Sequence, residues 1–236
     1  MTYEIMCIIP ARSGSKSLPH KNIKDFKGNP LLAWSIEQAK QSCFSNQMRI
    51  IVSTDSKQYA EIAKKWGAEV PFLRPEEISG DQSTDYECIK HAVEWLQEND
   101  NYTPDIILQL RPTQPCRKVE VINKCLELFL ENRGKYDSLR TVVEFEKSPY
   151  KMYSVDTHQN LLKPLFDEVT GIKEPYNQCR QILPKTYLHN GYIDIFNTEI
   201  IERGTISGTK IYPYIMDKND IIDIDTIDDW VKAENI

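Results

Sequence analysis

Two aspartates near the end of the chain have the spacing of a metal site. Asp223 and Asp225 lie two residues apart, within the stretch Ile-Asp-Ile-Asp-Thr at 222–226. In an extended strand, residues i and i+2 point to the same face, so both carboxylates would share one face while the isoleucines face the core. Two such carboxylates suit Mg²⁺ that is held jointly with a triphosphate. The alternative is an acidic surface turn beside a helix cap formed by Thr226 and Asp229.

A basic loop near the start of the chain has the composition of a phosphate-binding site. Residues 10–22 follow an apolar run and contain Gly14, three serines and the cations Arg12, Lys16 and Lys21. Small residues let backbone N–H groups approach a polyphosphate, and the cations balance its charge. The spacing matches neither a Walker A loop nor the dinucleotide-binding glycine pattern. A solvated basic loop is the alternative, but the position directly after a predicted strand favours phosphate binding.

The histidines and cysteines form no recognisable catalytic or zinc-binding pattern. The six cysteines contain no Cys-x-x-Cys pair, and the four histidines form no triad. The N-terminus has no basic leader, and its apolar run stops at Pro10, so we expect neither a signal peptide nor a membrane span. We therefore expect free thiols and a cytoplasmic protein.

Length and charge narrow the class of protein further. The 236 residues fit one large domain, with room for a small lobe. The formal net charge of -6 argues against a nucleic-acid partner, because proteins that bind nucleic acids usually carry a positive net charge.

Predicted strands and helices alternate along most of the chain. Strand-like apolar runs cover 5–9, 49–53, 105–110, 139–143, 189–196 and 210–215, with a short extended piece at 70–73. Helical patterns cover 30–41, 57–66, 84–97, 118–130 and 226–234. This alternation predicts an α/β fold with a mostly parallel sheet and helices on both faces. Ligands of such sheets bind beyond the carboxyl ends of the strands, which here are followed by 12–22, 53–55 and 111–117.

The alternation is interrupted between about 144 and 184. This segment is rich in Pro, Tyr and Lys. We interpret it as an inserted lobe with short strands inside a single domain that spans 1–236. It is a candidate for substrate contacts or for pairing of subunits.

Several sequence blocks, in order, resemble the acylneuraminate cytidylyltransferases, the CMP-sialic acid synthetase family. The loop at 10–22 resembles the N-terminal signature of that family. Further blocks that match in order and spacing lie at 51–55, 67–75, 111–117, 180–184, 190–193 and 222–226. The resemblance covers essentially the whole chain. It implies a Rossmann-like nucleotidyltransferase fold of the GT-A type, with a mixed sheet, and a homodimer built through the lobe at 144–184.

The resemblance also implies which residues bind the nucleotide and the metal. CTP would be bound by Arg12, Ser15, Lys16, Lys21, Asn22, Asp81 and Arg111. Asp223 and Asp225 would hold Mg²⁺, with Mn²⁺ as an alternative, and would act in catalysis with Arg12 and Lys21. The family often has Gln where this chain has Arg111, so a contact of Arg111 with base, ribose or phosphate stays open.

The acceptor implied by the resemblance is a nine-carbon sugar acid. Its carboxylate and N-acyl group would be bound by Lys151, Arg180, Gln181 and Asn190. A solvated side chain for Lys151 and a structural salt bridge for Arg180 are the alternatives. His189 stands where the family commonly has Pro, and 161–167 lacks an Arg that some sialic-acid enzymes carry. Legionaminate or pseudaminate therefore fits at least as well as N-acetylneuraminate.

The reaction that these assignments imply is attack of the sugar's anomeric hydroxyl on the α-phosphorus of CTP, with release of pyrophosphate. Three alternatives remain at this point. They are the same transfer to an eight-carbon acid of the Kdo type, a nucleotide-sugar glycosyltransferase, and a nucleotide-binding protein without catalysis.

Overall fold

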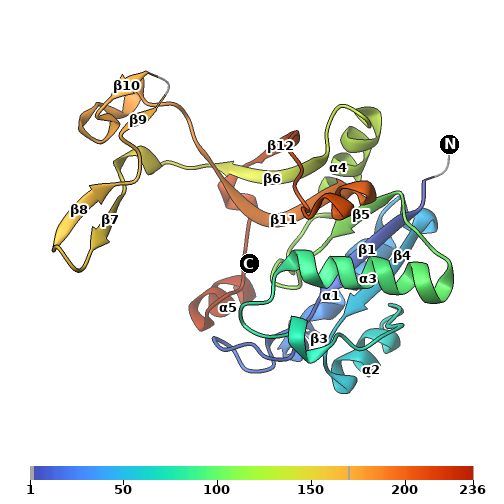
Figure 1. Ribbon diagram of the computed structural model, residues 1–236. Helices are drawn as coiled ribbons and strands as arrows, with labels where there is room; N and C mark the ends of the chain where they lie inside the picture. Colours follow the sequence, from blue (N-terminus) through green and yellow to red (C-terminus); the bar gives the residue numbers. More distant parts are fainter. Residues whose placement is uncertain (1–2, 170, 236) are drawn as a thin grey trace.

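A mixed six-stranded sheet lies at the centre of the computed structural model, which describes residues 3–169 and 171–235 (Figure 1). Its strand order is β12 (Ile211–Met216), β6 (Ser138–Glu144), β11 (Tyr187–Asn197), β5 (Ile106–Gln109), β1 (Ile5–Pro10) and β4 (Met48–Ser53). Strands β5, β1 and β4 are mutually parallel, as are β12 and β6, whereas β11 runs antiparallel to both of its neighbours. The predicted α/β fold with a mixed, mostly parallel sheet is confirmed.

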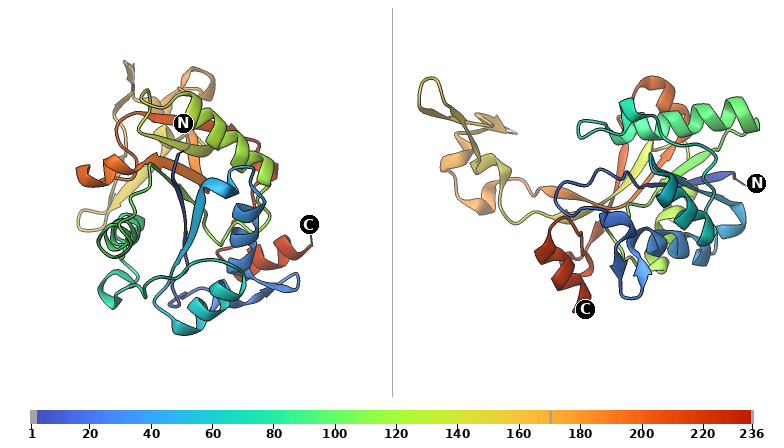
Figure 2. Two further views of the ribbon diagram at one scale, coloured as in Figure 1. Left: turned by 90° about the vertical axis from the view of Figure 1, so that its right-hand side faces the viewer. Right: turned by 90° about the horizontal axis from the view of Figure 1, so that it is seen from below.

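Helices cover both faces of this sheet, as predicted (Figure 2). On one face, apolar side chains of α1 (Leu31–Gln41), α2 (Lys57–Lys65) and α4 (Val119–Glu131) join the core of the sheet. On the other face lie α3 (Asp85–Asp100) and a 3-10 helix at Thr198–Arg203. Successive side chains of β1 point alternately into the core on one face of the sheet and the core on the other face. Both faces of the strand are therefore buried, which explains why it is apolar without interruption.

Local sequence signals set where the helices begin and end. Thr84 and Glu87 form a capping box at the start of α3, and Thr226 and Asp229 form another at the start of α5 (Ile227–Glu234). Gly67 adopts a φ of +90° just after α2, a conformation that favours glycine. These boundaries agree with the predicted ones.

Two segments that were predicted to be strands are not strands. Residues 70–73 form no strand, and the nearest sheet contact is a single bridge between Glu69 and Ile51. Residues 222–226 also lie outside any strand, because the last described strand ends at Met216. The backbone N–H of Ile224 instead donates to the carbonyl of Thr113 at 2.8 Å, which holds the segment against the loop after β5.

Residues between β6 and β11 extend away from the sheet (Figure 1). This segment, here called the lobe, spans 144–184 apart from residue 170, which lies outside the described residues. It contains the hairpin β7 (Tyr153–Asp156) and β8 (Leu161–Pro164) and the short pair β9 (Glu168–Val169) and β10 (Ile172–Lys173). A further short hairpin, β2 (Asp25–Phe26) and β3 (Asn29–Pro30), precedes α1. Among the helices that the structure describes, none has the length and apolar character to cross a membrane.

Candidate active site

The residues predicted to bind a nucleotide line one cavity of about 540 Å³ at the carboxyl end of β1. Its lining includes Arg12, Ser15, Lys16, Lys21, Asn22, Asp81, Arg111 and Asp225. These residues come from four separate parts of the chain, and the sheet brings them together because β1 and β5 are parallel neighbours.

The basic loop is held in place by hydrogen bonds to a residue that follows the neighbouring strand β4. The backbone N–H and the hydroxyl of Ser13 donate to the two carboxylate oxygens of Asp55 at 2.7 and 2.6 Å. Asp55 follows β4, which is paired with β1. Asn22 adds a second tie, since its Nδ2 donates to the carbonyl of Arg12 at 3.0 Å. Asn22 therefore helps to fix the conformation of the loop.

Asp81 forms ion pairs with two of the loop cations. Nη1 of Arg12 donates to the carbonyl of Gly80 at 2.6 Å and lies 3.1 Å from Oδ1 of Asp81. Lys16 forms an ion pair with the other carboxylate oxygen. The hydrogen bond from Lys16, with the help of Arg12, lowers the pKa of Asp81 below its ordinary value. The cations are thus gathered around one exposed carboxylate.

Lys21 joins the basic loop to the C-terminal segment. It lies in a 3-10 turn at Lys21–Ile23, and its side chain is only 10% exposed. Its Nζ donates to the carbonyl of Ile224 at 2.8 Å and to Oδ1 of Asp225 at 3.1 Å. Such a buried ammonium is oriented by two fixed acceptors and points toward the cavity that Asp225 also lines.

The two aspartates of the predicted metal site face two adjoining cavities. Asp225 lines the cavity of about 540 Å³, and Asp223 lines a second one of about 480 Å³. Ile224 between them is fully buried, so the predicted alternation holds although the segment is not a strand. Partial burial of its carboxyl, together with the charge of Asp225, raises the pKa of Asp223 against a hydrogen bond from Thr113.

The donor set at these aspartates fits Mg²⁺ that is shared with a substrate. Among the described residues, no group of three or more His, Cys, Asp or Glu side chains could hold a metal on its own. Mg²⁺ commonly takes one or two protein carboxylates and completes its shell with phosphate oxygens and water. Two mutually repelling carboxylates beside a cavity lined with cations are consistent with that arrangement.

Arg111 lines both cavities and is the one described residue that does so. Its Nη1 donates to Oδ2 of Asp194 at 2.6 Å, and its Nη2 donates to Oδ2 of Asp85 at 2.7 Å. A further contact joins Nη1 to the carbonyl of Gly191 at 3.3 Å. The guanidinium is therefore fixed between two carboxylates at the boundary of the two cavities.

Asp194 is a buried carboxylate that the sequence analysis missed. Its side chain is 2% exposed and contacts Arg111, Nε2 of His189 at 2.7 Å and Nε of Arg140 at 3.8 Å. Burial alone would raise its pKa, but the hydrogen bond with His189 and the charge of Arg111 lower the pKa to about 2. One signal was available: an aspartate inside an apolar strand needs a partner of opposite charge.

The predicted sugar-binding residues are divided between two regions. Asn190 lines the second cavity, where its Oδ1 accepts from the Thr141 hydroxyl at 2.6 Å and from the N–H of Tyr192 at 3.0 Å. Lys151, Arg180 and Gln181 are exposed on the lobe and do not line either cavity of their own chain. The structure thus brings Asn190, but not the other three, to the predicted site.

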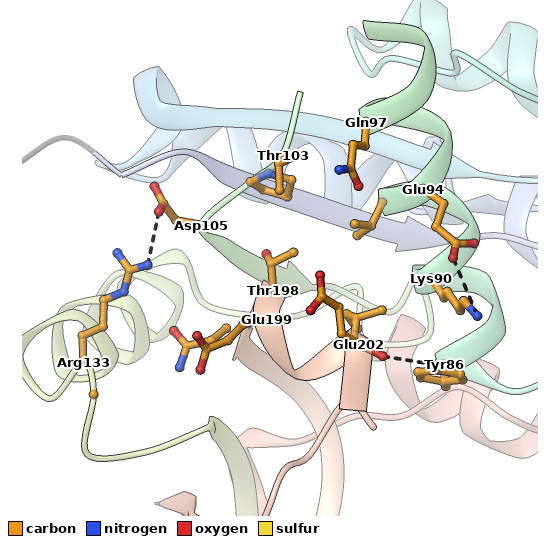
Figure 3. A pocket seen from close by; sticks show the side chains of 15 residues that line it. Tyr86, Lys90, Glu94, Gln97, Thr103, Asp105, Arg133, Thr198, Glu199 and Glu202 are labelled. Atoms are coloured by element: carbon orange, nitrogen blue, oxygen red, sulfur yellow. Dashed lines mark hydrogen bonds and ion pairs between the residues drawn. The ribbon is translucent and has the colours of Figure 1, made fainter. Parts of the chain in front are cut away.

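A larger cavity of about 630 Å³ lies between α3, the residues just before β5 and the 3-10 helix that follows β11 (Figure 3). It holds none of the predicted site residues. Several of its charged side chains are already paired, including Arg133 with Asp105 at 3.2 Å and Lys90 with Glu94 at 3.6 Å. Size alone therefore does not single out the cavity that gathers the loop cations and carboxylates.

Comparison with known proteins gives a consistent result. Residues 6–188 match the model of the family described as Cytidylyltransferase. The chain is 32% identical to a pseudaminic acid cytidylyltransferase of Campylobacter jejuni, over 95% of this chain and 92% of that protein. It is 36% identical to a CMP-N,N'-diacetyllegionaminic acid synthase of Legionella pneumophila, over 98% and 95% of the two chains. The fold is similar to that of a CMP:2-keto-3-deoxy-manno-octonic acid synthetase complexed with CTP, with a TM-score of 0.67, 14% identity and coverage of 98% and 97%.

Proposed function

This chain belongs to the cytidylyltransferase family, and we propose that it transfers CMP from CTP to the anomeric hydroxyl of a sialic-acid-like, nine-carbon sugar acid. The products are the CMP-sugar and pyrophosphate. The observation that carries the proposal is the pair of adjoining cavities. One gathers every residue predicted to bind CTP, the other adjoins it across Arg111, and Asp223 and Asp225 face one cavity each.

The triphosphate enters the first cavity by replacing Asp81 as the partner of the loop cations. Arg12 and Lys16 are held by that exposed carboxylate, which a polyanion of higher charge can displace. Lys21 stays oriented by Asp225 and the carbonyl of Ile224, so its ammonium is in place before the reaction starts. It stabilises the charge that develops on the α-phosphate and on the leaving pyrophosphate.

Asp223 and Asp225 are the residues that would hold Mg²⁺, or Mn²⁺ in its place. When bound there, the ion supplies screening of the triphosphate charge. The chemical step forms a bond between the anomeric oxygen and the α-phosphorus and breaks the bond from that phosphorus to the oxygen that bridges it to the β-phosphorus. That oxygen leaves with pyrophosphate, and the proton of the anomeric hydroxyl passes to water. Much of the rate comes from holding the two reactants in line where the two cavities adjoin.

The second cavity supplies the acceptor site. It combines the apolar side chains of Val143, Leu188 and Ile221 with the polar groups of His189 and Asn190. A mixed lining of this kind suits an acid that carries N-acyl groups and few hydroxyls, in keeping with the pseudaminic and legionaminic acids named for the two relatives.

A homodimer built through the lobe accounts for the sugar-binding residues that stay remote. Leu162, Val155 and other apolar side chains of the lobe are exposed in the single chain. Covering them with a second copy would bring Lys151, Arg180 and Gln181 within reach of a partner's acceptor cavity. We place this dimer in the cytoplasm, where the six free cysteines stay reduced.

The test is pyrophosphate release with CTP and Mg²⁺, measured against N-acetylneuraminate, legionaminate, pseudaminate and Kdo. We expect release with a nine-carbon acid, and a loss of at least about a hundredfold in kcat for Asp223→Ala, a typical cost of removing a transition-state contact. Asp228→Ala is the matched control, since Asp228 is an exposed first-turn acid of α5 in the same segment. Folded protein that binds CTP but releases no pyrophosphate with any of the four acids contradicts the proposal. Release with Kdo alone would assign the eight-carbon substrate instead.

A further inference from the structure

The rim of the second cavity carries a histidine that is held by a buried carboxylate. Nε2 of His189 lies 2.7 Å from Oδ1 of Asp194, whose other oxygen accepts from Arg111. The imidazole is 34% exposed and lines the cavity, whereas Asp194 is 2% exposed. Within the described part of the chain, Nδ1 of His189 has no hydrogen-bond partner.

Most of the other charged groups around this histidine lie close to groups of opposite charge. Arg111 bridges Asp194 and Asp85, and Arg140 on the adjacent strand β6 lies 3.8 Å from Asp194. From the segment across the cavity, Lys218 is paired with Glu146. Asp223, on the same segment, is the carboxylate that we assign to the metal. The charges that face the acceptor cavity are therefore nearly balanced without His189.

We propose that His189 is an acceptor-binding residue: Asp194 fixes one ring nitrogen, and the other binds the carboxylate of the sugar acid when the ring is protonated. This inference rests on the proposed function and adds to it a residue and a pH dependence. In the imidazolium both nitrogens carry a proton, so one can donate to Asp194 and the other to the ligand. In the neutral ring that donates to Asp194, Nδ1 presents a lone pair, which repels a carboxylate.

The position of His189 fits that role for two further reasons. Asp194 is buried and hydrogen-bonded to Arg111 at 2.6 Å, with Arg140 at 3.8 Å, so this carboxylate is restrained and orients the ring. His189 lines the second cavity and not the one proposed for CTP, so the nucleotide is not expected to contact the ring. Protonation of His189 should therefore act on the sugar and leave the affinity for CTP unchanged.

The experiment measures the KM of the sugar acid and the KM of CTP in the wild-type protein from pH 5.5 to 9. We expect the KM of the acid to rise by up to about tenfold to a hundredfold as the ring loses its proton, the range of a charge-assisted hydrogen bond, while the KM of CTP does not follow it. A KM of the acid that is flat in pH, or that changes in parallel with the KM of CTP, overturns the inference. This profile needs no variant, so it does not depend on how a mutant folds.

His189→Gln then assigns the effect to this ring. The amide can donate to Asp194 as Nε2 does, but it does not titrate. The variant should show a high and pH-independent KM for the acid, while the KM of CTP stays close to wild type. His158→Gln, in the turn between β7 and β8, should keep the wild-type profile. If His189→Gln retains the wild-type profile, the inference is wrong. If no acid releases pyrophosphate at any pH, the proposed function itself has failed.

Discussion

Lys21 shows how a single side chain can organise a site from both ends of a chain. Its ammonium bonds to the carbonyl of Ile224, 203 positions later in the sequence. Few of its rotamers satisfy both this carbonyl and Asp225, so the side chain loses its conformational freedom during folding and not during catalysis. The ammonium is thereby oriented before any substrate binds.

Replacing Lys21 should affect turnover more than binding. We expect Lys21→Gln to lower kcat by about a hundredfold to a thousandfold, because a preoriented charge is removed from the developing pyrophosphate. Steady-state pyrophosphate release and CTP binding by calorimetry provide the two measurements. Lys24→Gln is the control, since Lys24 lies over the ring of Trp230 and outside the cavity. Equal losses in both variants would contradict this role of Lys21.

Asp194 should make the free energy of unfolding depend on pH in the acidic range. Its folded pKa of about 2 lies below the ordinary value near 3.8, so its ionisation stabilises the folded state above about pH 4. This contribution, on the order of 2 kcal/mol, is lost as the pH falls from about 4 toward 2. Asp194→Asn removes it and leaves Arg111 without one of its partners. Urea unfolding should therefore show a difference between wild type and variant that is larger at pH 7 than at pH 2.5, and a constant difference would refute this assignment.

Most strands and helices could be predicted because each has a strong local signal. The run at 84–97 begins with a capping box and repeats apolar residues at helical spacing, and α3 begins where predicted. The loop cations were predicted from composition, and the structure gathers them in one cavity. Local signals suffice in these cases since the interactions that decide them lie within a few residues.

What could not be predicted depends on contacts between distant residues. Asp223 and Asp225 were assigned to a strand because their alternation is strand-like, but an extended segment becomes a strand only if a neighbouring strand pairs with it. Here Ile224 pairs with Thr113 of a loop. The partners of Arg111 were equally hidden, because Asp85 and Asp194 lie 26 and 83 positions away. Sequence spacing alone does not reveal such pairs.

Two glycines that precede β12 both have a positive φ but differ in the space around them. Gly208 has a φ of +67°, and a Cβ built there would overlap the side chain of Asp137, which accepts from the N–H groups of Thr209 and Lys210. Gly204 has a similar φ of +78° and open space around it. Gly204→Ala should lose about 1 kcal/mol in free energy of unfolding, the cost of the backbone conformation alone. Gly208→Ala should lose clearly more, by about 1 to 3 kcal/mol, because it also overpacks the turn. Chemical denaturation of the two variants checks the difference, and equal losses would contradict it.

Over the molecule as a whole, the lobe is a part that a single chain leaves largely uncovered. Its hairpins extend from the ends of β6 and β11 (Figures 1 and 2). Several of its apolar side chains are exposed to solvent. A separate lobe of this size has little core of its own, since isolated hairpins are marginally stable in water. A second copy that packs against it would supply the missing apolar contacts.

Charge placed on the lobe should therefore separate the subunits. Leu162 is 65% exposed in the single chain, and Leu162→Asp should shift the protein from dimer to monomer on a sizing column with light-scattering detection. Leu73→Asp is the control, because Leu73 is also exposed but lies outside the lobe. Wild-type protein that elutes as a monomer would rule out the proposed dimer, and a dimer that persists in Leu162→Asp would place the interface elsewhere.

The guanidinium of Arg111 forms a wall common to both cavities, and this has a thermodynamic consequence. If the two proposed substrates occupy these cavities, and CTP alters the affinity for the sugar acid by changing the hydrogen bonding of this group, then the sugar acid alters the affinity for CTP by the same factor. The two substrates are then not independent ligands but members of one linked equilibrium. The strength of that linkage depends on Asp85 and Asp194, the two carboxylates that limit how far the arginine can move.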